Sequence, residues 1–543
     1  MKKEARQGGL FEIRRQIMWN RLLAVVEEQA QTLLRTAFST IVRESGDLSA
    51  GVFDLRGSML AQAVTGTPGH VNSMAESVSH FLDVFPVDQM MEGDVYCTND
   101  PWKGTGHLND LVVVTPAFHA GKAVALFAST SHLMDIGGIG TVPDGTDVFM
   151  EGLAVPFLKL FQGGALNETL MAIFKANTRT PVDTEGDIYS LVNCNAIGTR
   201  RLSEMMREFG LDDLDELGRH ILESSRAAML EAIRALPKGT WTNSMTIDGY
   251  GEPVTLTART TISDSRIAVD FAGSSPASGK GINCPMSYAK AYAIFGLSCV
   301  VAPRIPNNAG SLSFFEVTAP EGSIVNALKP SPVASRHIVG QMLPDVVFGC
   351  LHKAIPHRVP AEGTSCLYMM IFRGREGGSN GAFASSIVTN GGVGARPGKD
   401  GLSATAYPSG VKGTPIEIVE TTTPLMFWKK ELRTGSGGSG QWRGGNGLEI
   451  EIENMAASPV ELLAAFDRIE HAPRGRDKGQ DGATGYLGIR DSKRTLSGKG
   501  VQVIHPGEVI QLRTPGGGGI GDPEMRDKAA VQLDIENGLV DQM

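Results

Sequence analysis

Glycine is the residue that most restricts what this chain can fold into. The sequence holds 66 glycines and 28 prolines among its 543 residues. Both residues favour turns and interrupt long helices, so this content favours a fold with many strands and loops over a helical bundle. Hydrophobic residues make up 41% and charged residues 20%, as in an ordinary globular protein, which excludes a wholly disordered chain.

The charge and the cysteines argue against several classes of partner and location. The net charge is −9 and no basic block stands out, so we expect no binding to nucleic acid or to an anionic membrane surface. No stretch reaches the roughly 18 apolar residues of a membrane span, and the first residues show no apolar signal region. The six cysteines form no C-x-x-C pair, which indicates reduced thiols and a cytoplasmic protein.

Hydrophobic periodicity predicts a helical N-terminal portion and a β-rich, glycine-rich C-terminal portion. Apolar residues recur at helical spacing over 10–37, and 331–357 is also expected to be helical. From Gly239 onward the pattern alternates with a period of two, and 448–453 is the plainest strand. We therefore predict a mixed α+β fold with three domains: an N-terminal α+β domain at 1–238, a central mixed α/β domain at 239–400 and a C-terminal β-rich domain at 401–543.

One segment combines residues that bind metals with a simple local fold. His107 and Asp110 form an H-x-x-D set that opens into an apolar strand, and His132 and Asp135 form a second set after another apolar strand. The two strands, within 111–130, are joined by a short turn with a glycine, which is typical of an antiparallel hairpin. In a hairpin the start of the first strand lies beside the end of the second. The two sets are therefore expected to meet.

Two imidazoles and two carboxylates at one strand end suit a divalent ion such as Zn, Mn or Fe. A single H-x-x-D is usually a surface hydrogen bond, but two copies that meet across a hairpin favour a metal site. Asp135 is either a ligand, a carboxylate that orients His132, or a general base. His70 lies in a loop of small residues and is a further ligand, a substrate contact or a local hydrogen-bonding side chain.

Other acidic and glycine-rich segments have simpler interpretations. Glu44 and Asp47 flank a turn and are expected to be solvated acids. Residues 435–440 satisfy G-x-G-x-x-G, but an alternating strand follows where a nucleotide site requires a helix. Residues 515–523 lack the Lys-Ser/Thr of a phosphate loop and are expected to form a tight turn or an interface loop. If the chemistry uses ATP, we expect the ATP to be bound elsewhere.

Several of these motifs occur together in one known order. They lie at 39–54, 69–70, 99–110, 131–138, 151–153, 186–187, 306–310, 319–322, 436–445 and 516–523. In this order the chain resembles the hydantoinase B/oxoprolinase family over almost its whole length. That family includes the corresponding subunits of caprolactamase and of acetone and acetophenone carboxylases.

The resemblance implies one half of a two-component enzyme. In this family a larger A-type subunit with an actin-like ATPase fold binds ATP and Mg and phosphorylates the carbonyl oxygen of the substrate. The metal is held by the B-type subunit, which also handles the activated intermediate. The metal motif of the ketone carboxylases implies His107, Asp110 and His132 as ligands. The first motif, which often reads G-G-T-H-L-P-D, is G-T-G-H-L-N-D at 104–110, so the ligands are kept while the loop around the substrate differs.

We therefore expect the metal-binding subunit of a hetero-oligomeric, ATP-dependent cyclic amide hydrolase. Its substrate class is a small ring such as hydantoin, N-methylhydantoin, oxoproline or a lactam, because the ketone carboxylase chains of the family are longer. Asp135 and His70 are the expected catalytic residues, which take a proton from the attacking water. One alternative is a subunit of an ATP-dependent ketone carboxylase. Another is a non-catalytic scaffold whose glycine-rich loops shape the active site of the partner.

Overall fold

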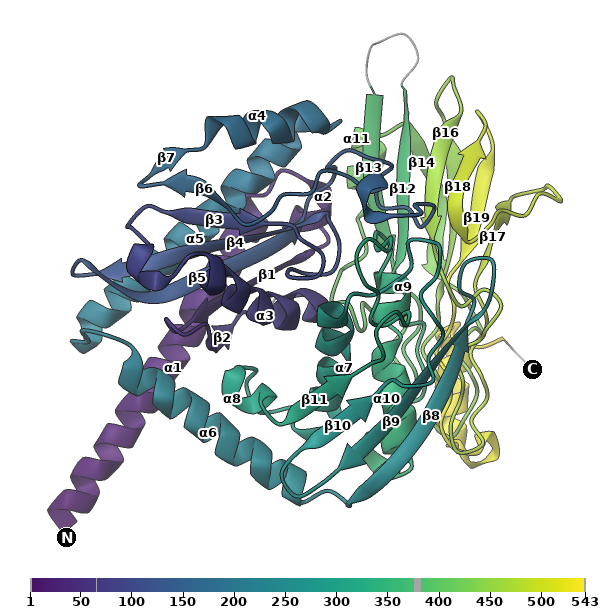
Figure 1. Cartoon of the computed structure of the whole chain (residues 1–543). Coiled ribbons are helices and arrows are strands. Elements are labelled where there is room, and N and C mark those ends of the chain that lie inside the picture. Colours follow the sequence, from purple (N-terminus) through teal and green to yellow (C-terminus); the bar gives the residue numbers. More distant parts are fainter. Residues whose placement is uncertain (1, 65, 376–381, 542–543) are drawn as a thin grey trace.

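The computed structural model describes residues 2–64, 66–375 and 382–541 (Figure 1). Helices and strands alternate along the chain, and the described strands form one seven-stranded sheet and three four-stranded sheets. The expectation of a mixed α and β fold is confirmed at this level.

An antiparallel sheet in the order β2-β1-β5-β4-β3-β6-β7 forms the N-terminal part. Residues of β4 alternate between its two faces: Leu111 and Val113 pack with helices α1 and α5, and Val112 and Val114 pack with α3. The sheet therefore lies between two helical layers. Its elements are α1 (Lys2–Thr36), α2 (Thr40–Arg43), β1 (Leu48–Phe53), β2 (Met59–Gln62), α3 (Pro68–Val84), β3 (Val95–Thr98), β4 (Asp110–His119), β5 (Lys122–His132), β6 (Leu158–Gln162), β7 (Ala165–Leu166), α4 (Glu168–Asn177), α5 (Pro181–Phe209) and α6 (Asp215–Arg234).

The central part is a smaller sheet covered by helices. Its order is β11-β10-β9-β8, with β10 and β11 parallel and the other pairs antiparallel. Helix α7 packs on both α3 and α10, which joins the central part to the N-terminal sheet. The elements are β8 (Gly239–Ile247), β9 (Val254–Ile262), β10 (Ile267–Asp270), α7 (Met286–Val301), α8 (Ala309–Leu312), β11 (Phe315–Thr318), α9 (His337–Gly340) and α10 (Leu343–His352).

The C-terminal part is a sandwich of two sheets, in the orders β13-β12-β16-β18 and β14-β15-β19-β17. One hydrophobic core draws residues from both sheets, as face-to-face packing requires. The predicted boundary at 400 falls inside this sandwich, and the division into three domains stays a prediction. The elements are β12 (Tyr368–Arg375), β13 (Ala382–Thr389), α11 (Ile416–Thr422), β14 (Leu425–Leu432), β15 (Leu448–Asn454), β16 (Val460–Ala465), β17 (Tyr486–Ile489), β18 (Lys499–Ile504), β19 (Val509–Arg513) and α12 (Lys528–Glu536).

Glycines in the last third of the chain pack backbone against backbone. A Cβ atom on Gly516 would lie 1.8 Å from the carbonyl oxygen of Ser436, and one on Gly517 would lie 2.2 Å from that of Val393. No side chain fits at such distances, so these positions require glycine. The glycine run within 515–523 is therefore explained by close packing of chain segments.

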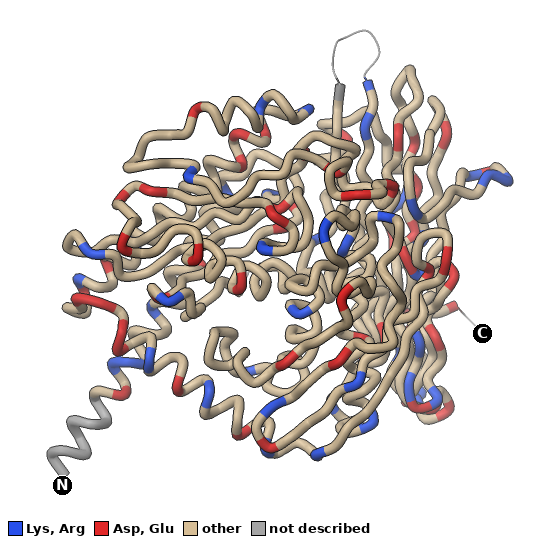
Figure 2. The backbone as a smooth tube through the Cα atoms, viewed as in Figure 1, with Lys and Arg blue, Asp and Glu red and all other residues tan. Residues whose placement is uncertain are grey.

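Charged residues of both signs are interspersed along the described chain (Figure 2). Within the described residues, no helix is both long enough and apolar enough to cross a membrane.

Candidate metal centre

The hairpin expected between the two H-x-x-D sets is formed by β4 and β5. Asp110, the first residue of β4, is paired with His132, the last residue of β5. The turn consists of Ala120 and Gly121, which both have positive φ angles, of 50° and 77°. Two such residues give the turn a twist that matches the flanking strands. The far ends of the strands are thereby held side by side.

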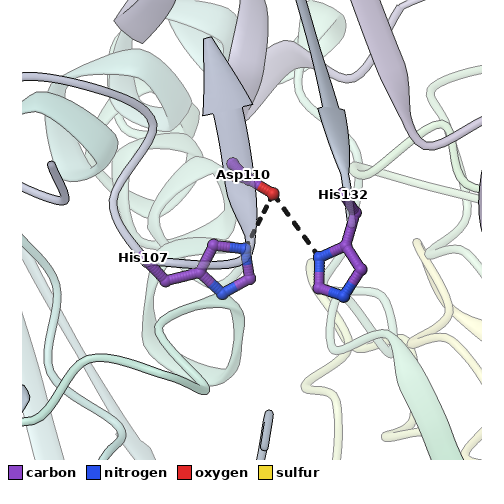
Figure 3. A group of neighbouring side chains, drawn as sticks. All are labelled: His107, Asp110 and His132. Carbon is purple, nitrogen blue, oxygen red and sulfur yellow. Dashed lines mark hydrogen bonds and ion pairs between the residues drawn. The ribbon is translucent and has the colours of Figure 1, made fainter. Parts of the chain in front are cut away.

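The predicted ligands His107, Asp110 and His132 converge at this end of the hairpin (Figure 3). His107 Nε2 lies 2.7 Å from Asp110 Oδ1, and His132 Nδ1 lies 3.4 Å from the same oxygen. One donor atom from each residue lies within 4.8 Å of the others, as three ligands of one ion require. All three side chains are buried, with exposed fractions between 1% and 3%.

The second oxygen of Asp110 is held by hydrogen-bond donors. Thr105 Oγ1 donates to Oδ2 over 2.7 Å, Arg336 donates to it through its guanidinium, and His70 Nε2 lies 3.0 Å away. These contacts fix the carboxylate and turn Oδ1 towards the two imidazoles. Although burial alone would raise the pKa of Asp110, His107, His70 and Arg336 hold it well below its ordinary value. Asp110 is therefore ionised.

The contacts of His107 show which of its ring nitrogens faces Asp110. His107 Nδ1 lies 3.0 Å from the carbonyl oxygen of Ala334, which can only accept, so Nδ1 carries the hydrogen. Burial and the charge of Arg336 lower the pKa of His107 to about 4 despite Asp110, so the ring is neutral near pH 7. His107 Nε2 then faces Asp110 Oδ1 at 2.7 Å. A nitrogen and a carboxylate oxygen this close share a positive charge, either a proton or a metal ion, and two imidazoles with a carboxylate are a donor set that fits a divalent metal.

A small cavity of about 20 Å³ is lined by two of the three residues, His107 and His132. This volume is enough for one water molecule. Its walls come from all three parts of the chain: His70 of α3, Tyr288 of α7, His337 of α9 and, on the side of the sandwich, Leu367 and Met369. The candidate site therefore lies where the N-terminal sheet, the central helices and the C-terminal sandwich meet.

His70 and His337 are buried in the wall of this cavity and differ in their charge preference. Burial lowers the pKa of His70, but Asp110 and Asp47 outweigh it, and the net pKa is raised. Burial and the nearby Arg336 lower the pKa of His337 to about 3. Near neutral pH, His337 is therefore an uncharged side chain that can accept a hydrogen bond.

Asp47 was expected to be a solvated acid, and that expectation is wrong. Its exposed fraction is 8%, and it lines the cavity. Strand β1 pairs with β5 with Leu48 opposite Ser131, so the preceding Asp47 lies at the same sheet end as His132. Thr67 Oγ1 donates to Asp47 Oδ1 over 3.1 Å. The sequence alone could not show this, because it does not reveal that the segment after Asp47 pairs with β5.

Arg336 is a second residue that sequence reasoning missed. Its exposed fraction is 3%, its Nε donates to the carbonyl oxygen of Thr105 over 2.8 Å, and its guanidinium stacks 4.1 Å from the ring centre of Tyr288. Gly106 makes room for it, because a Cβ there would lie 2.6 Å from Arg336 Cδ. The only hint in the sequence was a charged residue in a mostly apolar segment. The side chain supplies the positive charge nearest to Asp110.

Asp135, expected to be catalytic, does not line the cavity. Its carboxylate accepts hydrogen bonds from the side chain of Arg179 over 2.8 Å, from Thr178 Oγ1 over 3.2 Å and from the N–H of Gly137 over 3.1 Å. Among the described residues, no hydrogen bond joins it to His132. The structure thus brings His70 to the predicted ligands and leaves Asp135 in the loop after the hairpin.

A family model described as hydantoinase B/oxoprolinase matches residues 12–523. The chain belongs to this family. It is 29% identical to the B-type component of a putative D-/L-hydantoinase from Pseudomonas sp. (strain NS671), over 97% of this chain and 92% of that protein.

Two solved structures share the fold. The crystal structure of the ATP-dependent caprolactamase from Pseudomonas jessenii matches with a TM-score of 0.90 and 26% identity, over 98% of this chain and 94% of that chain. A nucleotide-free structure of acetone carboxylase matches with a TM-score of 0.86 and 18% identity, over 96% of this chain and 78% of that chain. The second likeness shows the fold alone.

Proposed function

We propose that this chain is the metal-binding B-type subunit of a two-component, ATP-dependent cyclic amide hydrolase. The observation that carries the proposal is the convergence of three buried donor atoms, from His107, Asp110 and His132, with His107 Nε2 only 2.7 Å from the Asp110 carboxylate. Membership of the hydantoinase B/oxoprolinase family supports the substrate class, a small ring with an amide bond.

The partner in this proposal is an A-type subunit that binds ATP and Mg and phosphorylates the ring carbonyl. Two relatives are named as single components of larger enzymes, one of a hydantoinase and one of a caprolactamase. The chain contains no phosphate-loop sequence, in agreement with ATP bound by another chain. We propose a cytoplasmic hetero-oligomer.

His107, Asp110 and His132 would hold the ion, and Asp47 offers a further carboxylate in the same cavity. A bound Zn, Mn or Fe ion supplies a positive charge that makes water more acidic. Arg336 and Thr105 keep the Asp110 carboxylate in place, and the Ala334 carbonyl keeps His107 in the tautomer that can bind a cation.

His70 is the proposed acceptor of a proton from the attacking water, because it lies in the cavity wall beside Asp110. Water adds to the activated carbonyl carbon, the ring C–N bond breaks as the ring nitrogen takes a proton, and a second water molecule hydrolyses the acyl phosphate that is left. The overall reaction consumes one ATP and two water molecules, and it releases ADP, phosphate and the open-chain acid. Asp135 is proposed to act indirectly, by holding the loop that follows His132.

The test combines this chain with its A-type partner. Ring opening of hydantoin, N-methylhydantoin, 5-oxoproline and caprolactam is measured with and without ATP, and bound metal is determined by elemental analysis. His107→Ala and His132→Ala should lose stoichiometric metal and at least 100-fold of the turnover. His471→Ala is the matched control, because His471 pairs with Asp248 over 2.9 Å outside the cavity. It should keep both properties.

Two other outcomes identify the alternatives. An ATP-dependent ketone carboxylase, suggested by the shared fold of acetone carboxylase, would consume bicarbonate in step with substrate, whereas a hydrolase would not. The near-complete overlap with the caprolactamase chain favours the hydrolase. A purified complex with no stoichiometric metal in this chain would overturn the proposal in favour of a scaffold role.

A further inference from the structure

Glu151 is a buried carboxylate just outside the cavity whose contacts lead to the candidate metal centre. Its exposed fraction is 1%. Its Oε1 accepts the backbone N–H groups of Val333, over 2.7 Å, and Ala334, over 2.8 Å. Oε2 has no hydrogen-bond partner among the described residues. A carboxylate so deeply buried is costly unless its bonds hold something in place.

The backbone that Glu151 holds is the segment that contacts two of the proposed ligands. The carbonyl oxygen of Ala334 accepts the hydrogen bond of His107 Nδ1 over 3.0 Å. Two residues further on, Arg336 donates to Asp110. One short segment thus orients both the imidazole and the carboxylate, and Glu151 is bonded to the start of it.

The other side of Glu151 packs on the loop that leaves the hairpin. A Cβ atom on Gly138 would lie 2.6 Å from the carbonyl carbon of Glu151, so the two segments are in close contact. The neighbouring Val148 N–H donates to the carbonyl oxygen of Pro330 over 3.0 Å, which is a second link to the same region of the central part. Glu151 therefore lies between the hairpin that supplies His132 and the segment that orients His107.

We propose that Glu151 is a positioning residue of the metal centre, which places the Ala334 carbonyl and thereby sets the orientation and tautomer of His107. The inference rests on the proposed metal site. Both N–H bonds go to a single oxygen, so an amide oxygen at the same place can replace the carboxylate. The role is one of hydrogen-bond acceptance, not of charge.

The chain offers a closely matched control in Asp187. Its exposed fraction is 0%, its Oδ1 accepts the N–H groups of Phe38 over 2.7 Å and Ser39 over 3.1 Å, and its Oδ2 has no partner among the described residues. Asp187 is not among the residues that line the cavity. Glu151 and Asp187 thus have similar burial and the same bonding pattern. They differ in what is contacted by the backbone segment that each of them holds.

The test measures the affinity of the full, metal-free chain for Co²⁺ by competition with a chelator. Glu151→Met fills the space without an acceptor and should weaken binding about 10- to 100-fold, as is typical when a group that orients a ligand is lost. Glu151→Gln keeps the acceptor and should stay within about threefold of the wild type. Asp187→Leu should lower the unfolding temperature but leave the Co²⁺ affinity within the same range.

A second readout separates positioning of His107 from general loosening of the fold. His107→Ala should itself bind Co²⁺ only weakly, and adding Glu151→Met should weaken this remaining binding, measured at high Co²⁺ concentration, by less than about twofold, because the ring that Glu151 positions is gone. A full further loss in that background would overturn the inference. The inference would also be overturned if Glu151→Gln weakened Co²⁺ binding tenfold or more, or if Asp187→Leu weakened it as much as Glu151→Met does.

A crystal structure of the metal-free chain tests the role of Glu151 separately from the proposed function. The Ala334 oxygen should remain within hydrogen-bond distance of His107 Nδ1 in the wild type and in Asp187→Leu, and move out of reach in Glu151→Met. If it stays in place in Glu151→Met, the inference fails even where Co²⁺ binds. If it moves as expected but the wild type binds no metal, the proposed function fails, and what stands of the inference is that Glu151 places the Ala334 carbonyl and His107.

Discussion

Two of the clusters of buried charge among the described residues differ in their chemistry, and only one of these two has that of a metal site. The Asp110 cluster consists of Asp110, His70, His107, His132 and Arg336. The Arg468 cluster consists of Arg468, Asp345, Glu362 and Arg474. Arg468, with 1% exposure, lies 3.3 Å from Glu362 and 3.8 Å from Asp345, and Arg474 Nε donates to Glu362 over 2.7 Å.

The difference lies in what faces each carboxylate. In the Arg468 cluster, guanidinium, hydroxyl and backbone N–H groups donate to Asp345 and Glu362, so each contact joins a donor to an acceptor. In the Asp110 cluster, one oxygen also has donors, but the other faces the ring nitrogens of His107 and His132. Burial of charge is therefore common to both clusters. Convergence of two imidazole nitrogens on one carboxylate oxygen marks the candidate metal site.

The largest effect is expected from Asp110→Asn. The amide keeps the size of the side chain but removes the negative charge, and its NH₂ group turns a donor towards either the imidazoles or Arg336. Metal affinity should fall more than about 1000-fold, which corresponds to roughly 4 kcal/mol. Chelator competition with the full chain measures it. Stoichiometric metal at micromolar concentration in this variant would contradict the assignment of Asp110 as a ligand.

The second prediction concerns Arg468→Met, which should have the opposite profile. Loss of the guanidinium leaves Asp345 and Glu362 buried with fewer partners, so the free energy of unfolding should fall by about 3 kcal/mol. Metal affinity of the folded chain should not change. Denaturant unfolding and chelator competition on the same sample separate the two properties. A loss of metal with unchanged stability would show that the clusters are not independent.

The sequence predicted the part of this comparison that depends on local pairing. His107, Asp110 and His132 could be placed together because the hairpin has a short turn and its register follows from the turn. The long helix at α1 and the strand at β15 follow in the same way from periodicity within one segment. These features need no knowledge of how distant segments pack.

The sequence could not predict the residues that reach the site through tertiary packing. Asp47 depends on the pairing of β1 with β5, and Arg336 depends on the docking of the central helices against the hairpin. Asp135 has the same spacing from His132 as Asp110 has from His107, yet its carboxylate bonds to Arg179 because the chain turns after β5 instead of continuing as a strand. Equal spacing gives equal positions only where the backbone conformation is also equal.

The third prediction compares the pH dependence of His337, in the cavity wall beside the Asp110 cluster, with that of Asp345 in the Arg468 cluster. The pKa of His337 is lowered to about 3, so the folded chain binds fewer protons there than the unfolded chain, and stability is lost as the pH falls below about 6.5. Burial, with the charge of Glu362, raises the pKa of Asp345 to about 6, so its contribution is lost as the pH rises from about 4 to 6. The dependence of stability on pH therefore has opposite signs for His337 and Asp345.

The opposite pH dependence is tested by measuring unfolding temperatures between pH 4 and 7. The proteins compared are the wild type, His337→Gln and Asp345→Asn. The advantage of the wild type over His337→Gln should grow with pH, and its advantage over Asp345→Asn should shrink, each by about 1 kcal/mol per pH unit at most. Parallel curves for all three proteins would show that neither group titrates in this range. Slopes of the same sign would contradict the contrast between the clusters.

The smallest effect is expected from Asp135→Asn. Its partner Arg179 is largely exposed, so the ion pair contributes little, and the amide oxygen keeps part of the hydrogen bonding. Stability should fall by about 1 kcal/mol, metal content should stay stoichiometric, and turnover with the A-type partner should remain within about threefold. His70→Gln, which alters the cavity wall, should instead lower turnover at least tenfold with the metal retained. If Asp135→Asn abolished turnover while metal and fold were intact, the loop would have to bring its carboxylate to the substrate in the assembled enzyme, and Asp135 would take the role of general base that its spacing from His132 first suggested.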